Sequence, residues 1–200
     1  KGRFNPREQS YDAAIRADSF PLNSFLPADS LGIVDLALQA RGTGFDPLLP
    51  RTRTSLRAQI DRAEFGGRDF GGIELDAELD SQRLSGRISD RDEALRLLLS
   101  VSGTLTEREQ RIGLSGSVFG FDLAALGVSP EPIGGSFALD ASASAAGKGA
   151  YAARIALDSI EIRNKHRTDR IRPTSVSLHT DSAATRAEAA SRGLSPTVSP

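Results

Sequence analysis

The sequence predicts an all-β protein, an antiparallel meander that forms one elongated, curled sheet with a few short helical turns. Apolar and polar residues alternate through most of the chain, most clearly over residues 73–80, where odd positions are apolar and even positions acidic. This period of two gives a strand one apolar and one polar face. The alternating segments are short, and tight turn signals join them in sequence order, which is typical of a meander.

The N-terminal part of the chain contains two expected strands around a break. Residues 1–10 are polar and are expected to form a flexible segment. A first strand is expected at residues 11–17 and a second at residues 34–39. Between them, residues 20–27 contain two prolines and irregular apolar spacing, which predicts a short helical turn or a tight bend.

Two further breaks carry capping residues. In residues 45–50 Asp46 precedes a proline, which suits the cap of a single helical turn. In residues 121–127 Asp122 is the expected N-cap of another turn and Gly127 its C-cap.

The remaining alternating segments predict further strands, which with the N-terminal ones form a single domain over residues 11–189. Residues 190–200 are expected to be a frayed tail. The glycine-rich residues 66–72 are expected to form a hairpin turn, because no helix follows them to make a phosphate-binding loop. The expected strands are residues 56–61, 73–80, 84–88, 95–105, 112–118, 137–143, 151–157, 160–163 and 175–180.

Such a sheet has one aliphatic face, which three architectures hide: a β-sandwich, a closed barrel, or a curled sheet whose face lines a groove. Alternation alone does not choose among them, and the β-sandwich is the main alternative. Two features favour the groove. Aromatic residues make up only 6% of the chain. Many apolar positions are small, which leaves room along a trough: Ala58, Ala77, Ala141, Ala143 and Ala153.

The composition excludes several classes of function. The 200 residues are 38% hydrophobic with a net charge of −1, so the chain folds but has no basic face for nucleic acid. There is no cysteine, which excludes disulfides and thiolate metal sites. There is no methionine, so we expect a fragment of a longer protein. No apolar run approaches the roughly 20 residues of a membrane-spanning helix.

Residues with catalytic or metal-binding chemistry are sparse. His166 and His179 lack neighbouring ligands and are expected at the surface. The Gly-Leu-Ser-Gly-Ser run at residues 113–117 lies within a strand and not in a nucleophile elbow. We therefore expect no enzymatic activity, no cofactor and no metal.

Two acidic groups have the residue types of calcium ligands. One alternates along a strand and the other lies in a turn, whereas calcium loops need irregular backbone with convergent oxygens. A soluble surface is the simpler interpretation of both. The groups are Asp76, Glu78 and Asp80, and Asp90, Asp92 and Glu93.

The order of breaks and strands resembles a known family. The segments that carry the resemblance are residues 20–27, 34–44, 45–52, 70–77, 84–88 and 121–127. Together they resemble the central region of TamB proteins from Bacteroidetes, members of the AsmA-like group, over roughly residues 11–192.

This resemblance implies a location and a function. Such proteins are anchored in the inner membrane by an N-terminal helix and cross the periplasm as a long, curled β groove with an apolar lining. They are implicated in phospholipid transport between the inner and outer membranes and in outer-membrane assembly. Their partner is an outer-membrane barrel protein, contacted through a far C-terminus that this chain does not show.

The expected function is thus to shield phospholipid acyl chains in an apolar groove. The alternative is a structural or adhesive β-module whose apolar face is an ordinary packed core. The residues expected to line the groove are Val34, Leu36, Leu38, Leu56, Ile60, Ile73, Leu75, Leu79, Leu97, Leu99, Val101, Ile112, Leu114, Val118, Phe137, Leu139, Ile155 and Leu157.

Overall fold

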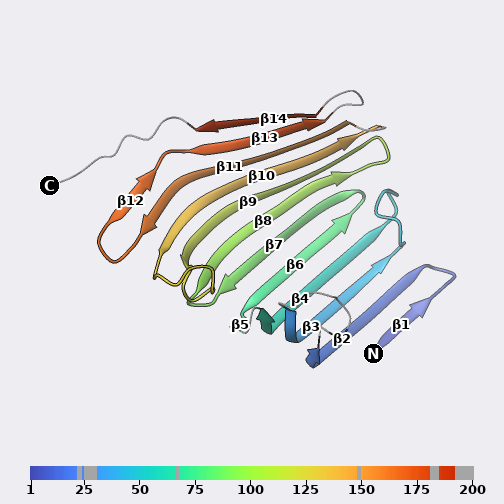
Figure 1. The fold of residues 1–200 in the computed structure, drawn as a ribbon. Coiled ribbons are helices and arrows are strands. Elements are labelled where there is room, and N and C mark those ends of the chain that lie inside the picture. The colour runs from blue at the N-terminus through green and yellow to red at the C-terminus, as the bar shows by residue number, and fades with distance from the viewer. Residues whose placement is uncertain (22–23, 25–30, 66–67, 148–149, 181–184, 192–200) are drawn as a thin grey trace.

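The protein is one open, twisted antiparallel sheet (Figure 1). The computed structural model describes residues 1–21, 24, 31–65, 68–147, 150–180 and 185–191. Fourteen strands lie in this part of the chain: β1 (Gly2–Asn5), β2 (Ser10–Pro21), β3 (Leu31–Thr43), β4 (Arg53–Phe65), β5 (Arg68–Phe70), β6 (Ile73–Asp80), β7 (Arg83–Arg91), β8 (Leu95–Leu105), β9 (Glu109–Asp122), β10 (Gly134–Ala146), β11 (Ala150–Arg163), β12 (Thr168–Ile171), β13 (Thr174–Thr180) and β14 (Thr185–Ser191).

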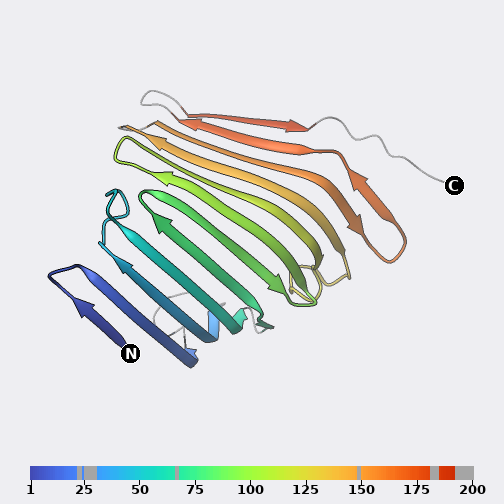
Figure 2. The ribbon, with the colours of Figure 1, turned by 180° about the vertical axis from the view of Figure 1, so that it is seen from behind.

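The strands follow a meander, as predicted. Twelve of them form one path in sequence order, and the short strands β5 and β12 pair beside it with β4 and β11. At about 4.8 Å between neighbours, this path is about 53 Å wide. β1 and β14 lie at opposite ends of the sheet, which therefore does not close into a barrel (Figures 1 and 2).

Both chain ends depart from the expected boundaries. The expectation of a loop at residues 1–10 was wrong for Gly2–Asn5, which form β1 and pair with β2. The cause is an aromatic cluster, since the ring of Phe45 lies 5.7 Å from that of Phe4 and 5.4 Å from that of Tyr11. At the other end, β14 runs to Ser191, past the expected start of the tail, and residues 192–200 lie outside the described residues.

The breaks are turns between strands. The Asp46 carboxylate accepts the Leu48 N–H at 2.9 Å. The Asp122 carboxylate accepts the Ala124 N–H at 2.8 Å, and the Leu126 N–H donates to the Asp122 carbonyl at 2.9 Å, as in one turn of α-helix.

Gly127 ends this second turn with a φ of +74°, which a residue without a Cβ adopts without strain. The expected caps Asp122 and Gly127 are therefore confirmed. Of the break expected at residues 20–27, Phe20 and Pro21 belong to β2, and the remainder lies outside the described residues apart from Ser24.

The alternation in the sequence becomes two different faces of the sheet. In β6 the odd residues are half-buried and the even residues exposed. Residues paired across antiparallel strands point to the same side, so the register extends the apolar side outward from Leu75. Leu75 lies opposite Ala58 on one side and Ile88 on the other, and Ile88 lies opposite Leu99.

The sheet forms a single layer, which Figure 2 shows from behind. No side chain in the described ranges is completely enclosed. The apolar side chains with less than about a tenth of their surface exposed are Val34, Leu99, Val118 and Ile160. Within the described residues no second sheet covers the apolar side, so the β-sandwich alternative is not formed there.

Irregular register is confined to one end of the strands. Register shifts fall where β2 meets β3, β3 meets β4, β8 meets β9, and β10 meets β9 and β11. All of these lie on the side of the sheet where β6 begins, which we call the bulged end; the opposite side is the open end. Extra residues bend a strand and increase its twist. Of the four most buried apolar side chains, Val34, Val118 and Ile160 lie toward the bulged end and Leu99 lies near the middle of β8.

Candidate functional site

The structure places every predicted lining residue on one face of the sheet, the apolar face. The register joins them in continuous cross-strand rows such as Leu36–Ile60–Ile73. Other rows link Val101 to Leu114, and Leu139 to Leu157. A single surface of aliphatic side chains therefore extends from β3 to β11.

Exposure varies along this face. Val34 and Val118 are buried near the bulged end and Leu99 near the middle of β8, whereas Ile112 is 43% and Ile155 52% exposed farther toward the open end. The other predicted lining residues are half-buried. The apolar face is therefore more enclosed along its bulged end and accessible along its open end.

The register adds residues to this face that the sequence analysis did not include. Leu84 and Ile88 lie on an expected strand, so their alternation could have placed them. Because β11 contains a bulge, Ile160 lies on the apolar face, although alternation counted from Leu157 would place it on the polar face. The additional large residues include Phe4, Tyr11, Ile15, Phe20, Phe70, Leu84, Ile88, Leu105, Tyr151, Ile160, Val176 and Leu178.

Small side chains hollow the apolar face toward its open end. A depression of about 260 Å³ lies over β9, β10, β11 and β13. Ala143 and Ala153, two of the small residues noted in the sequence, contribute to its lining, together with Ala145, Ile112 and Leu178. A flexible hydrocarbon fits such a depression without needing a directional contact.

One carboxylate lies at the bulged end of the apolar face. Asp90 is only 5% exposed and lies opposite Leu97. Burial raises the pKa of Asp90 above its ordinary value, while the Asp92 N–H, which donates to its carboxylate at 2.8 Å, opposes that change. The expected turn at this point begins later than predicted, because β7 continues through Arg91.

The polar face carries exposed ion pairs. Arg57 lies 2.6 Å from Asp76, Arg53 lies 2.8 Å from Asp80, and these acids belong to the row considered for calcium. Hydrogen bonds from the Ser81 hydroxyl and from Arg53 lower the pKa of Asp80. The Asp76 and Asp80 carboxylates are therefore explained as ion-pair and hydrogen-bond partners of arginine and serine side chains on the polar face.

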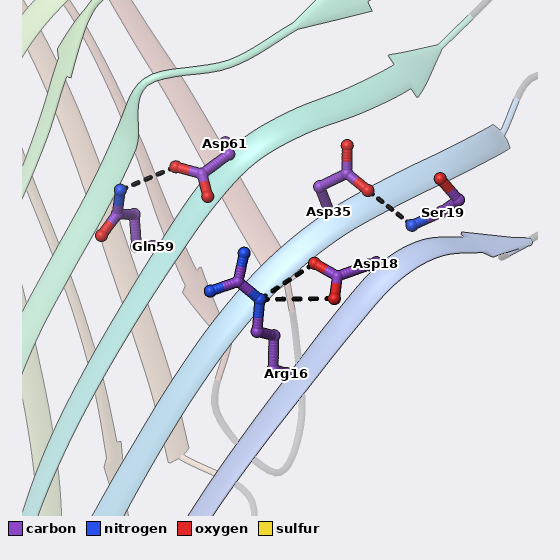
Figure 3. A network of polar contacts seen from close by, with 6 residues as sticks. All are labelled: Arg16, Asp18, Ser19, Asp35, Gln59 and Asp61. Carbon is purple, nitrogen blue, oxygen red and sulfur yellow. Dashed lines mark hydrogen bonds and ion pairs between the residues drawn. The ribbon is translucent and has the colours of Figure 1, made fainter.

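The same kind of contact continues toward the N-terminus (Figure 3). Arg16 binds both carboxylate oxygens of Asp18, at 3.0 and 3.3 Å, and the Gln59 amide donates to Asp61 at 2.7 Å. These contacts join residues on the polar face of β2 and of β4, so polar side chains on this part of the face are paired with one another.

The two histidines lie apart. His166 is exposed in the turn between β11 and β12, where its backbone N–H donates to the Asn164 side chain at 2.9 Å. His179 is exposed on the polar face of β13. In the part of the chain that the structure describes, no three His, Asp or Glu residues gather in a way that could hold a metal ion.

A membrane-spanning helix is not found among the described residues, since none of their helices is long and apolar enough. The fold and the site define a class, an open antiparallel sheet with one apolar face that no second layer covers among the described residues. No family model, curated protein or solved structure matches the chain significantly.

Proposed function

We propose that the apolar face shields phospholipid acyl chains from water during their transfer between two membranes. In this proposal the chain is a segment of a larger protein that is anchored in the inner membrane and crosses the periplasm. That protein supports outer-membrane assembly together with an outer-membrane barrel protein. The observation that carries the proposal is the continuous aliphatic face, which no second layer covers within the described residues.

The energetics favour a ligand of this kind. Exposing an acyl chain to water costs about 0.8 kcal/mol for each CH₂ group. The apolar face pays a similar cost when it faces water, so both surfaces gain from contact. Its aliphatic residues offer no directional polar contact, and a hydrocarbon can therefore move along the face from strand to strand.

The two ends of the strands suit the two parts of a phospholipid. Val34 and Val118 are enclosed near the bulged end, whereas Tyr151 is exposed toward the open end. We place the acyl chains over the enclosed part and the wet headgroup at the open end. This orientation keeps charge away from the most deeply buried leucine and valine side chains.

Photo-crosslinking tests the proposal. A photoreactive residue at Leu75 or Leu99 should capture lipid in cells, and mass spectrometry of the purified chain should identify phospholipid. The matched control is Glu78, on the polar face of the strand that carries Leu75. Capture of protein alone at both apolar positions would indicate the alternative, a structural or adhesive module with a packed apolar face.

A charged substitution on the apolar face distinguishes lipid shielding from a structural or adhesive role. Because Leu75 is only half-buried, Leu75→Asp should leave the sheet folded, with a loss of about 1–3 kcal/mol, and should abolish lipid retention. Glu78→Lys should change neither property. Circular dichroism and lipid quantification measure the two effects, and unfolding by Leu75→Asp would instead indicate a packed core.

A further inference from the structure

A second hollow lies on the polar face, over β9, β10, β11 and β13. Its volume is about 390 Å³. The register places Arg154 between Ser142 and Ser177, and the next row contains Ser144 and His179. Arg111 lies opposite Ser144 on the far strand. Small hydroxyl side chains therefore line the hollow together with two arginines and a histidine.

The charge of this hollow differs from that of the rest of the polar face. On β3 and β4, Arg41 pairs with Asp12 at 3.2 Å and Arg57 with Asp76 at 2.6 Å. Among the residues that the structure describes, the lining of the hollow contains no carboxylate and Arg154 forms no ion pair.

Carboxylates lie near the hollow, but those of the described residues are outside its lining. Arg111 lies 2.5 Å from Glu109, which is outside the lining, so Arg154 is the principal unneutralised cation. Asp140 lies on the same face, one cross-strand row away from Ser142.

We propose that this hollow binds a phosphate ester through Arg154 and the surrounding serines. A guanidinium donates two parallel hydrogen bonds to an oxyanion, and serine hydroxyls supply further donors. The volume exceeds that of a bare phosphate, so the ligand carries its phosphate on a larger group. The hollow faces away from the apolar face, and the proposal does not rest on the function proposed above.

The probe is inorganic phosphate, titrated at low ionic strength into the ¹⁵N-labelled 200-residue chain. Amide shifts should saturate and should be confined to β9, β10, β11 and β13. Arg154→Gln should weaken binding about tenfold or more, since hydrogen bonds to charged groups are involved. The matched control Arg57→Gln removes an ion-paired arginine from the same face and should leave the affinity unchanged.

A second variant separates a built site from simple charge attraction. Ser142→Ala with Ser177→Ala keeps the net charge but removes hydroxyl donors, and it should weaken phosphate binding several-fold. Shifts that do not saturate, or equal affinities in all of these variants, would overturn the proposal. Dispersed amide spectra verify that each variant remains folded.

Competition identifies the source of the phosphate. Displacement of phosphate by glycerol phosphate, but not by phosphatidylglycerol vesicles, indicates a soluble ester. Displacement by those vesicles, but not by phosphatidylcholine vesicles, indicates an anionic lipid headgroup. Failure of glycerol phosphate and phosphatidylglycerol alike to compete would overturn the assignment of a phosphate ester as the ligand.

Discussion

Gly116 occupies a place in β9 where a side chain would collide with the neighbouring strand. Its φ is +153°, and a Cβ there would lie 2.2 Å from the Leu98 carbonyl oxygen and 2.9 Å from the Leu99 Cα. Both obstacles are backbone atoms, which cannot move without disturbing the ladder. The residue therefore holds β8 and β9 close together in the middle of the apolar face.

Replacing this glycine should be costly. Gly116→Ala should destabilise the sheet by about 1–3 kcal/mol, because it combines backbone strain with a steric clash. Urea unfolding measures the change. Gly113→Ala is the control on the same strand, since its Cβ would come no closer than 3.3 Å, to the flexible Ser102 hydroxyl. An equal loss in both variants would show that the close approach is unimportant.

Asp90 should make the stability of the sheet depend on pH. Burial raises the pKa of this carboxyl above its ordinary 3.8 in the folded state. The folded protein thus binds the proton more tightly than the unfolded chain, and stability falls as pH rises from the unfolded pKa through the folded one. Asp90→Asn keeps an acceptor for the Asp92 N–H and should remove this fall.

The measurement is a series of urea midpoints between about pH 4 and about pH 7. The stability of Asp90→Asn relative to the original chain should increase with pH across this window. Asp140→Asn, on the exposed polar face, shows whether loss of net charge alone has this effect. Parallel profiles for Asp90→Asn and the original chain would contradict the prediction.

At the scale of elements, the Asp122 side chain caps the first turn of the connection between β9 and β10. The Asp122 carboxylate accepts the N–H groups of Ala124 and Ala125, at 2.8 and 3.2 Å. Asp122→Ala should cost about 1 kcal/mol, as capping losses do. Asp122→Asn retains the acceptor and should cost less, which thermal unfolding can compare. Equal losses would mean that the charge matters and the hydrogen bonds do not.

The elements also show what the sequence could predict. Alternation gave β6 and β8 at their observed bounds, because each of these strands keeps one phase of alternation along its whole length. It did not predict β1, in which Phe4 is the one large apolar residue. It also predicted two separate strands where β11 continues through a bulge before Ile160. A bulge depends on the partner strand as well as on local sequence, so the phase change is not readable from one strand alone.

The phase of alternation along each strand also decided which residues of the candidate site could be predicted from the sequence. The lining residues were placed on one face because each lies on a strand whose phase is clear. Leu98, in the middle of an apolar run, lies on the polar face and is exposed. Asp90 was assigned to a turn, since nothing in its immediate neighbours indicates that β7 continues. Whether a second layer covers the face is a tertiary property, which alternation does not encode.

At the scale of the whole molecule, cohesion comes from side-by-side pairing. A globular domain usually packs two layers around one core, whereas the described residues form one layer. The apolar side chains shield one another laterally and remain open above. The exposed aliphatic area therefore extends over the entire sheet. The solubility of such a sheet depends on its charged opposite face.

All substantial contacts between elements join strands that are neighbours in the sheet. The molecule is in this respect a one-dimensional chain of coupled units, like a repeat protein. Amide hydrogen exchange should accordingly be slowest in β7, β8 and β9 and should quicken stepwise toward β1 and β14. Uniform protection across the sheet would contradict this gradient. Local weakening, such as Gly116→Ala, should accelerate exchange beside β9 first, so a disturbance fades with each strand it crosses.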